Sequence, residues 1–137
     1  QGYALSPGCG VTLREGSDLA FIGYGPVMLR EAFRAAQLLK ERGISAAVID
    51  LPWLNRVDAA WLMKIMAPFR AVVTLDNHYV HQGQGEFVAA SLLKAGLHPR
   101  IISCGVQEIP ACGLNDEVLR YHGLDAESLA TQAASLA

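Results

Sequence analysis

The sequence has no excess of basic charge, no long uninterrupted hydrophobic run and few cysteines. Its 11 Lys and Arg residues are outnumbered by 13 Asp and Glu residues, so the formal net charge is −2 at pH 7. Lys and Arg form no stripe along the chain, and nothing in the charge pattern favours nucleic acid or an anionic membrane as a partner. Charged residues interrupt the apolar runs well before the roughly 18 residues that a membrane-spanning helix needs.

The cysteine count argues against a disulfide framework. Cys9, Cys104 and Cys112 are odd in number and lack close pairing, which favours a reducing compartment such as the cytoplasm. Cys104 and Cys112 are too far apart for the usual pair of zinc ligands. We therefore expect structural or incidental thiols and no metal site. The N-terminus shows no secretory-signal pattern, but the first residue is Gln1 rather than Met, so the sequence can be a fragment.

The length and composition indicate one folded domain. The chain has 137 residues, 52% of them hydrophobic and 18% charged, which excludes intrinsic disorder. Short apolar runs alternate with segments whose apolar residues fall at helical spacing. The predicted strands are Val11–Arg14, Leu19–Tyr24, Ile44–Leu51, Ala71–Leu75 and Arg100–Ser103. The predicted helices are Val27–Arg42, a helix from the Asp58 cap to about Ala67, Glu86–Ala95, and two closing helices capped by Asn115 and Asp125.

Near-continuous apolar strands separated by amphipathic helices predict a parallel sheet covered on both faces. The tight turn after Val11–Arg14 allows that segment to be an antiparallel neighbour or to change layer. Ligands of such sheets bind at the carboxyl ends of the strands. Any site should therefore draw on Gly23–Pro26, Leu51–Asp58, Asp76–Gly85 and Cys104–Gly113.

Two glycine pairs follow predicted strands without completing a dinucleotide fingerprint. After Gly23 and Gly25 the third glycine position is Met28, and after Gly83 and Gly85 it is Val88. Both pairs suit turns. Alternatively, the helix that starts near Gly85 could bind an anion through its free N–H groups, which makes Gly83 and Gly85 a candidate anion or substrate edge.

The most polar cluster of the chain runs from Asp76 to His81. His78 could be a proton donor or a hydrogen-bond donor to a substrate at the edge of a cleft. In the alternative interpretation, Asp76 and Asn77 satisfy backbone groups of a loop and the histidines lie on a surface or subunit contact. His78 and His81 lack a third metal ligand at a sensible spacing.

Trp53, Leu54 and Val57 form an apolar edge beside Asp58 and are candidate interface residues. Trp61 falls on a predicted helix, where it can belong to the core. Gln1–Gly10, which is rich in Gly and Pro, is typical of a linker that arrives from an upstream domain or partner. The predicted domain is then residues 11–137.

In order and spacing, several motifs resemble the C-terminal domain of transketolase. They are Val11–Leu19, Gly23–Gly25, Val48–Leu51, Asp58, Val73-Thr74 followed by Asp76–His78, Gly83-x-Gly85 and Gly123–Asp125. The resemblance runs from Val11 to about Leu129. It implies a three-layer α/β/α fold with a five-stranded, mostly parallel sheet in which the Val11 strand is antiparallel. It also implies a role in dimerisation and at the active-site entrance, where His78 is the candidate residue.

Enzymes of this family use thiamine diphosphate and a divalent metal such as Mg²⁺. The resemblance implies that both bind on two upstream domains or on a partner subunit. This sequence has no Gly-Asp-Gly with a downstream Asn, so we expect no cofactor-binding residue in it. The isolated chain should then be inactive and should work as part of a homo- or hetero-oligomer.

Three hypotheses remain open at the level of sequence. The chain is part of a transketolase that transfers two-carbon ketol units between sugar phosphates. Alternatively, it belongs to a 2-oxoacid dehydrogenase beta subunit or a 1-deoxyxylulose-5-phosphate synthase. A third possibility, from another class, is a stand-alone regulatory module that binds a small anion.

Overall fold

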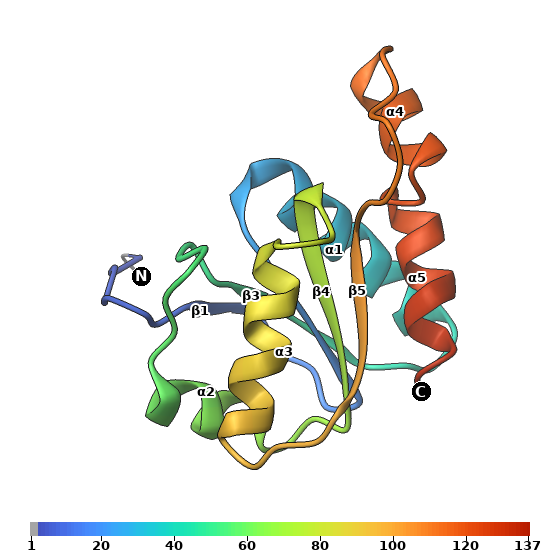
Figure 1. Cartoon of the computed structure of the whole chain (residues 1–137). Coiled ribbons are helices and arrows are strands. Elements are labelled where there is room, and N and C mark those ends of the chain that lie inside the picture. The colour runs from blue at the N-terminus through green and yellow to red at the C-terminus, as the bar shows by residue number, and fades with distance from the viewer. Residues whose placement is uncertain (1–2) are drawn as a thin grey trace.

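The computed structural model describes residues 3–137 and shows one twisted sheet with helices on both faces (Figure 1). The strands are β1 (Val11–Arg14), β2 (Leu19–Gly23), β3 (Ala46–Asp50), β4 (Ala71–Tyr79) and β5 (Arg100–Val106). The helices are α1 (Gly25–Glu41), α2 (Ala59–Met66), α3 (Gln84–Lys94), α4 (Asn115–Tyr121) and α5 (Ala126–Ala134).

The strand order is β1-β3-β2-β4-β5. β1 runs antiparallel to β3, whereas the pairs β2–β3, β2–β4 and β4–β5 are parallel. The mixed five-stranded sheet with one antiparallel strand is therefore confirmed, and β1 is a neighbour in the sheet rather than part of another layer. Because the four parallel strands point the same way, the segments that follow them meet at one edge, which we call the carboxyl edge.

Alternate residues of the central strands supply two separate cores. Leu19 and Phe21 of β2 pack in a buried cluster with residues of α1 and α5, such as Met28 and Leu129. Their neighbours Ala20 and Ile22 pack on the other side of the sheet with α2 and α3. Burial on both faces explains why these strands are apolar without alternation.

A buried acid joins α1 to the last helix. Glu31 lies among apolar residues on the inner side of α1 and is 1% exposed. Its carboxylate accepts the backbone N–H of Ala126 at 2.9 Å and contacts the guanidinium groups of Arg30 and Arg34. Asp125 precedes α5, but its side chain makes no capping bond. Glu31 therefore does the capping that we expected of Asp125, because it approaches the first amide of α5 from the neighbouring helix.

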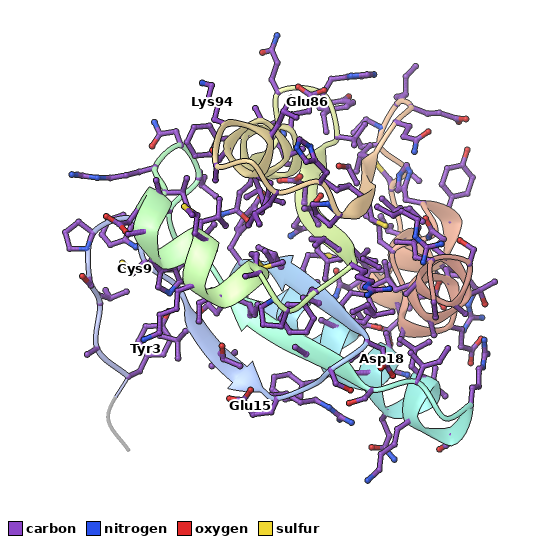
Figure 2. The ribbon with its side chains drawn as sticks, turned by 90° about the horizontal axis from the view of Figure 1, so that it is seen from below. Tyr3, Cys9, Glu15, Asp18, Glu86 and Lys94 are labelled. Carbon is purple, nitrogen blue, oxygen red and sulfur yellow. The ribbon has the colours of Figure 1, made fainter. Side chains whose placement is uncertain are left out.

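The described part of the N-terminal segment lies against the domain. The Tyr3 hydroxyl donates to Asp50, and the backbone N–H of Asp58 donates to the Gly8 carbonyl. Figure 2 shows Cys9 beside α2. Residues 1–2 of the predicted linker lie outside the described residues, and its connection to an upstream domain remains a prediction.

Several predicted boundaries differ from the structure. β4 continues through Asp76–Tyr79, which we expected to be a loop, because Tyr79 pairs with Val106 after an irregularity in the ladder. This tertiary pairing overrides the low strand propensity of Asp and Asn. Asn115 is the first residue of α4 and not its cap. Asp58 does cap α2, since its carboxylate accepts the N–H of Trp61 at 2.8 Å.

Within residues 3–137, no helix combines the length and the apolar character that a membrane crossing would require.

The Glu31 contact predicts an unequal effect of two substitutions on one helix. Glu31→Ala should lower the free energy of unfolding by about 2 kcal/mol, since it removes a hydrogen bond to a charged group and leaves the Ala126 amide unpaired. Glu41→Ala, at an exposed position of α1, should change it by less than about 0.5 kcal/mol. Urea denaturation of both variants measures the difference. Equal small changes would show that Glu31 does not join α1 to α5.

Candidate functional site

The carboxyl edge is organised around the buried side chain of Asp76. Asp76 is 0% exposed, and its two carboxylate oxygens accept the backbone N–H groups of Gln84 at 2.8 Å and Gly85 at 2.9 Å. These are the first two amides of α3, so the carboxylate satisfies donors that a helix start leaves free and lies at the positive end of the helix dipole. Asp76 thus fastens the beginning of α3 to the end of β4.

This arrangement explains the two glycines that precede and open α3. A Cβ at Gly83 would lie 2.7 Å from the Asp76 carboxylate, and a Cβ at Gly85 would lie 2.3 Å from Thr74 Oγ1. Neither distance is tolerable, so the absent side chains let the helix approach the strand. The amides of Gln84 and Gly85 already donate to Asp76, which removes the donors that the predicted anion edge at Gly83 and Gly85 required. We do not propose an anion there.

Tyr24 brings the end of β2 into the same network. Its hydroxyl donates to Asp76 Oδ1 at 3.3 Å. Burial and the negative charge of Asp76 raise the pKa of Tyr24 to about 12. The phenol therefore keeps its proton through the neutral range, and that proton is directed at Asp76.

Gln84 connects the network to the segment that follows β3. Its side-chain N–H groups donate to the carbonyl oxygens of Leu51 at 2.6 Å and Trp53 at 3.0 Å. Gln84 is 3% exposed; its bond to Leu51 is buried and its bond to Trp53 is partly buried. Asp76, Tyr24 and Gln84 together fix three of the four segments that we expected to form a site.

His78 is exposed at the end of β4, next to this network. Its Nδ1 lies 3.0 Å from the Tyr79 carbonyl oxygen. Since a carbonyl can only accept, Nδ1 carries the proton in this contact. The other ring nitrogen, Nε2, is then an acceptor in the neutral imidazole.

The turn between β4 and α3 is braced by Glu86. Its carboxylate accepts the backbone N–H of Gln82 at 2.9 Å and lies 3.3 Å from His81 Nδ1. The hydrogen bond from the Gln82 N–H lowers the pKa of Glu86, and the contact with His81 lowers it to a smaller extent. Gln82 has a φ of 62°, a left-handed conformation that favours glycine. Glu86 lies in the first turn of α3 and Lys94 in the last turn.

The three candidate interface residues differ in how much surface they expose. Trp53 is half-buried, packs against the α2–α3 core and donates its indole N–H to the Cys9 carbonyl at 3.0 Å. Val57 is also half-buried against that core. Leu54 is 53% exposed and is the member of this set best placed to meet another molecule.

A hollow at the carboxyl edge brings several of the predicted site residues together. Tyr24, Trp53, Leu54 and His78 line it, with Gln84 at its border. Gly83 also lines it, whereas Val57 and Gly85 do not belong to its lining. Sequence reasoning had placed His78, Trp53 and Leu54 on this edge but had not connected them through Tyr24, Asp76 and Gln84.

The site residues that the sequence did not reveal are polar groups inside apolar surroundings. The sequence places Asp76 in a polar segment after a strand, where one interpretation has it satisfy backbone groups, and it places Gln84 between two turn glycines. Tyr24 was seen only as part of a Gly-x-Gly pattern. The one signal that could have found them is the Gly83-x-Gly85 spacing, because two glycines at a helix start indicate that another group approaches closely.

A metal site built from protein side chains requires several ligands close together. Within residues 3–137, no three His, Cys, Asp or Glu side chains gather as ligands. Burial, together with the charge of Asp76, raises the pKa of the Cys104 thiol to about 12, so this cysteine is a poor thiolate ligand.

Residues 8–129 match the family model of the transketolase C-terminal domain. The chain belongs to this family. It is 36% identical over 124 residues to a protein of Methanocaldococcus jannaschii named as a transketolase C-terminal section, covering 90% of this chain and 38% of that protein. It is also 30% identical over 129 residues to 1-deoxy-D-xylulose-5-phosphate synthase of Parabacteroides distasonis, covering 93% of this chain and 20% of the synthase.

Solved structures agree with this assignment. A split-gene transketolase, described as an inactive tetramer of beta chains, matches with a TM-score of 0.87 and 29% identity. The match covers 98% of this chain and 45% of that one. A transketolase from Pichia stipitis shares the fold at 17% identity, with a TM-score of 0.73 over 94% of this chain and 18% of that one. The domain thus spans less than half the length of these relatives.

Gly85 lies so close to Thr74 and Asp76 that we expect alanine at this position to be destabilising. In most helices, by contrast, alanine is more favourable than glycine. Gly85→Ala should lower the free energy of unfolding by about 2 kcal/mol, since its Cβ would overlap Thr74 and Asp76. Helix propensity alone predicts a gain of about 1 kcal/mol. Gly113→Ala is the control, because its nearest neighbour lies 3.3 Å away on an exposed Glu117 side chain. Chemical denaturation that shows Gly85→Ala to be neutral or stabilising would refute the proposed packing.

Proposed function

We propose that this domain is the C-terminal part, or a separate subunit, of a transketolase-type enzyme that transfers two-carbon ketol units between sugar phosphates. The observation that carries the proposal is the 36% identity over 90% of the chain to a relative named as a C-terminal section of transketolase. The relatives are much longer than this domain. We propose that the remaining part of such an enzyme carries the cofactor.

In this proposal, thiamine diphosphate and Mg²⁺ bind on upstream domains or on a partner subunit. The described side chains offer no metal-ligand group. The domain instead supports assembly and borders the active-site entrance through the carboxyl edge. His78 is the proposed entrance residue, and it lines the hollow together with Tyr24 and Trp53.

The distribution of exposed apolar side chains supports assembly through the carboxyl edge. Leu54 follows β3, Tyr79 ends β4, and Ile109 and Leu114 follow β5, and all four are exposed. Ile109 is 87% exposed, and the segment that leads to α4 stands away from the sheet (Figure 1). These four residues come from three segments on the same edge of the sheet, and exposed apolar surface of this kind suits contact with another molecule. We therefore propose that a catalytic partner or a second copy covers this edge.

A second candidate function is that of 1-deoxyxylulose-5-phosphate synthase. Several such synthases are 30–33% identical to this chain over about nine-tenths of its length. Both enzymes would use this domain in the same structural way, and the two functions differ in whether pyruvate or a ketose phosphate donates the two-carbon unit. We also propose a cytoplasmic location, which the three free cysteines support.

The test of the proposed function is an assay of the chain with and without its partner. The partner is the upstream section, or the product of a neighbouring gene, that contains Gly-Asp-Gly with a downstream Asn. Alone, the chain should neither bind thiamine diphosphate with Mg²⁺ in calorimetry nor transfer ketol units. Combined with the partner, it should convert ketose and aldose phosphates. Micromolar cofactor binding by the chain alone would contradict the division of roles, and activity on pyruvate only would favour the synthase.

A pair of leucines tests the proposed interface. Leu54→Ala should raise the dissociation constant of the complex with the partner about tenfold, because an exposed apolar anchor is lost at the carboxyl edge. Leu93→Ala is the matched control, since Leu93 is 63% exposed near the far end of α3. Analytical ultracentrifugation measures both constants. Equal constants for the two variants would place the interface elsewhere. Trp53→Ala should weaken association as well, but it also removes core contacts.

A further inference from the structure

The hollow at the carboxyl edge is large enough for a small ligand. Its volume is about 450 Å³, within the roughly 300–1,000 Å³ that small-molecule sites occupy. The hollow between Glu31, Arg34 and Asp125 is smaller, at about 70 Å³, which holds no more than a few waters. The chemistry of the larger hollow can be deduced from the hydrogen bonds that its side chains already make.

Tyr24 can act toward a ligand only as a hydrogen-bond acceptor. Its single O–H is donated to Asp76 Oδ1, and a carboxylate cannot return a proton to the phenol oxygen. The backbone N–H of Asn77 also donates to the phenol oxygen. Because Tyr24 is only partly buried, the remaining lone pair of that oxygen is available to a ligand. The raised pKa of Tyr24, about 12, keeps this arrangement unchanged at neutral pH.

The contact between His78 and Tyr79 leaves a second acceptor in the hollow. Its Nδ1 proton is directed at the Tyr79 carbonyl, which leaves Nε2 with a lone pair. Two acceptors in one hollow suit a ligand that carries several O–H groups. They do not suit a phosphate, whose oxygens need donors.

The rest of the lining also disfavours a charged ligand. The described residues around the hollow include no Lys or Arg, and the first two amides of α3 are occupied by Asp76. Trp53 and Leu54 supply an apolar wall of the kind against which the C–H face of a sugar can pack. The side chains of Asn55 and Gln82 add amide groups that both donate and accept.

We propose that this hollow is a subsite for the uncharged, hydroxyl-bearing part of a sugar, bound by Tyr24 Oη and His78 Nε2 against Trp53. Its assignment to the substrate of the assembled enzyme rests on the proposed function. The phosphate of such a substrate is then held elsewhere, by groups outside this hollow. His78 acts here as an acceptor for a hydroxyl, which differs from the donor role that the sequence suggested.

NMR titration of the 137-residue chain tests the subsite without the partner. The domain has two closed cores of its own, so the isolated chain is a suitable sample. Three probes are compared: ribitol, ribose 5-phosphate and inorganic phosphate. Ribitol and ribose 5-phosphate should shift the Trp53 indole and His78 ring signals with dissociation constants of about 1–10 mM, the range of a small polar fragment. Inorganic phosphate at the same concentrations should leave these signals unchanged.

Matched variants assign the binding to the two acceptors. Tyr24→Phe keeps the ring but removes the oxygen, and His78→Ala removes Nε2. Each should weaken ribitol binding roughly threefold to tenfold, as expected for one lost hydrogen bond. Tyr79→Phe and His81→Ala are the controls, because these neighbouring exposed residues do not line the hollow, and they should leave the dissociation constant unchanged. Spectra of each variant in the absence of probe verify the fold.

Three results would overturn the subsite: no shift with ribitol up to 50 mM, an equal shift with phosphate alone, or equal effects of the variants and their controls. The outcome is separate from that of the proposed function. The reconstituted enzyme can transfer ketol units although ribitol fails to bind. That result would contradict the subsite and leave the proposed function intact. Conversely, ribitol can bind to a chain whose assembled form lacks transferase activity, and the hollow would then be a sugar site of another protein class.

Discussion

The carboxyl edge of this domain depends on one buried charge. A carboxylate away from water costs several kcal/mol unless hydrogen bonds compensate it. Asp76 receives three of them, from two amides of α3 and the Tyr24 hydroxyl. Because two donors open α3 and the third follows β2, the need to compensate Asp76 also fixes the end of β2 and the start of α3.

The same constraint determines what the edge can do chemically. The first two amides of α3 and the phenol proton of Tyr24 are directed inward at Asp76, so they are not free to donate to a ligand in the hollow. Trp53 shares in this rigidity through the bond from Gln84 to its carbonyl. Under the proposed function, this domain contributes shape, hydroxyl recognition and a contact surface. Its relatives are more than twice as long, and the proposal places the chemistry of the cofactor on the remaining part.

Features that depend on neighbouring residues in the sequence were predictable, whereas contacts between distant residues were not. The strands around Phe21, Val48 and Val73 were predictable because burial on both faces requires continuous apolar runs. Asp58 was predictable because a cap is local. Glu31 capping Ala126 was not, since the two lie 95 residues apart. One interpretation of the sequence was that Asp76 satisfies backbone groups, and it does. The identity of its partners in α3 and at Tyr24 was not predictable, because only the fold brings them close.

The exchange rates of two amide protons test the central role of Asp76 most directly. In the native chain, the Gln84 and Gly85 amides should exchange slowly because both donate to the carboxylate. In an Asp76→Ala variant they should exchange roughly tenfold to a hundredfold faster, the effect of losing a hydrogen bond to a charged group. The amide of Val72, in the middle of the sheet, should stay protected. Fast exchange of Gln84 and Gly85 in the native chain, or rates that the substitution leaves unchanged, would contradict the account.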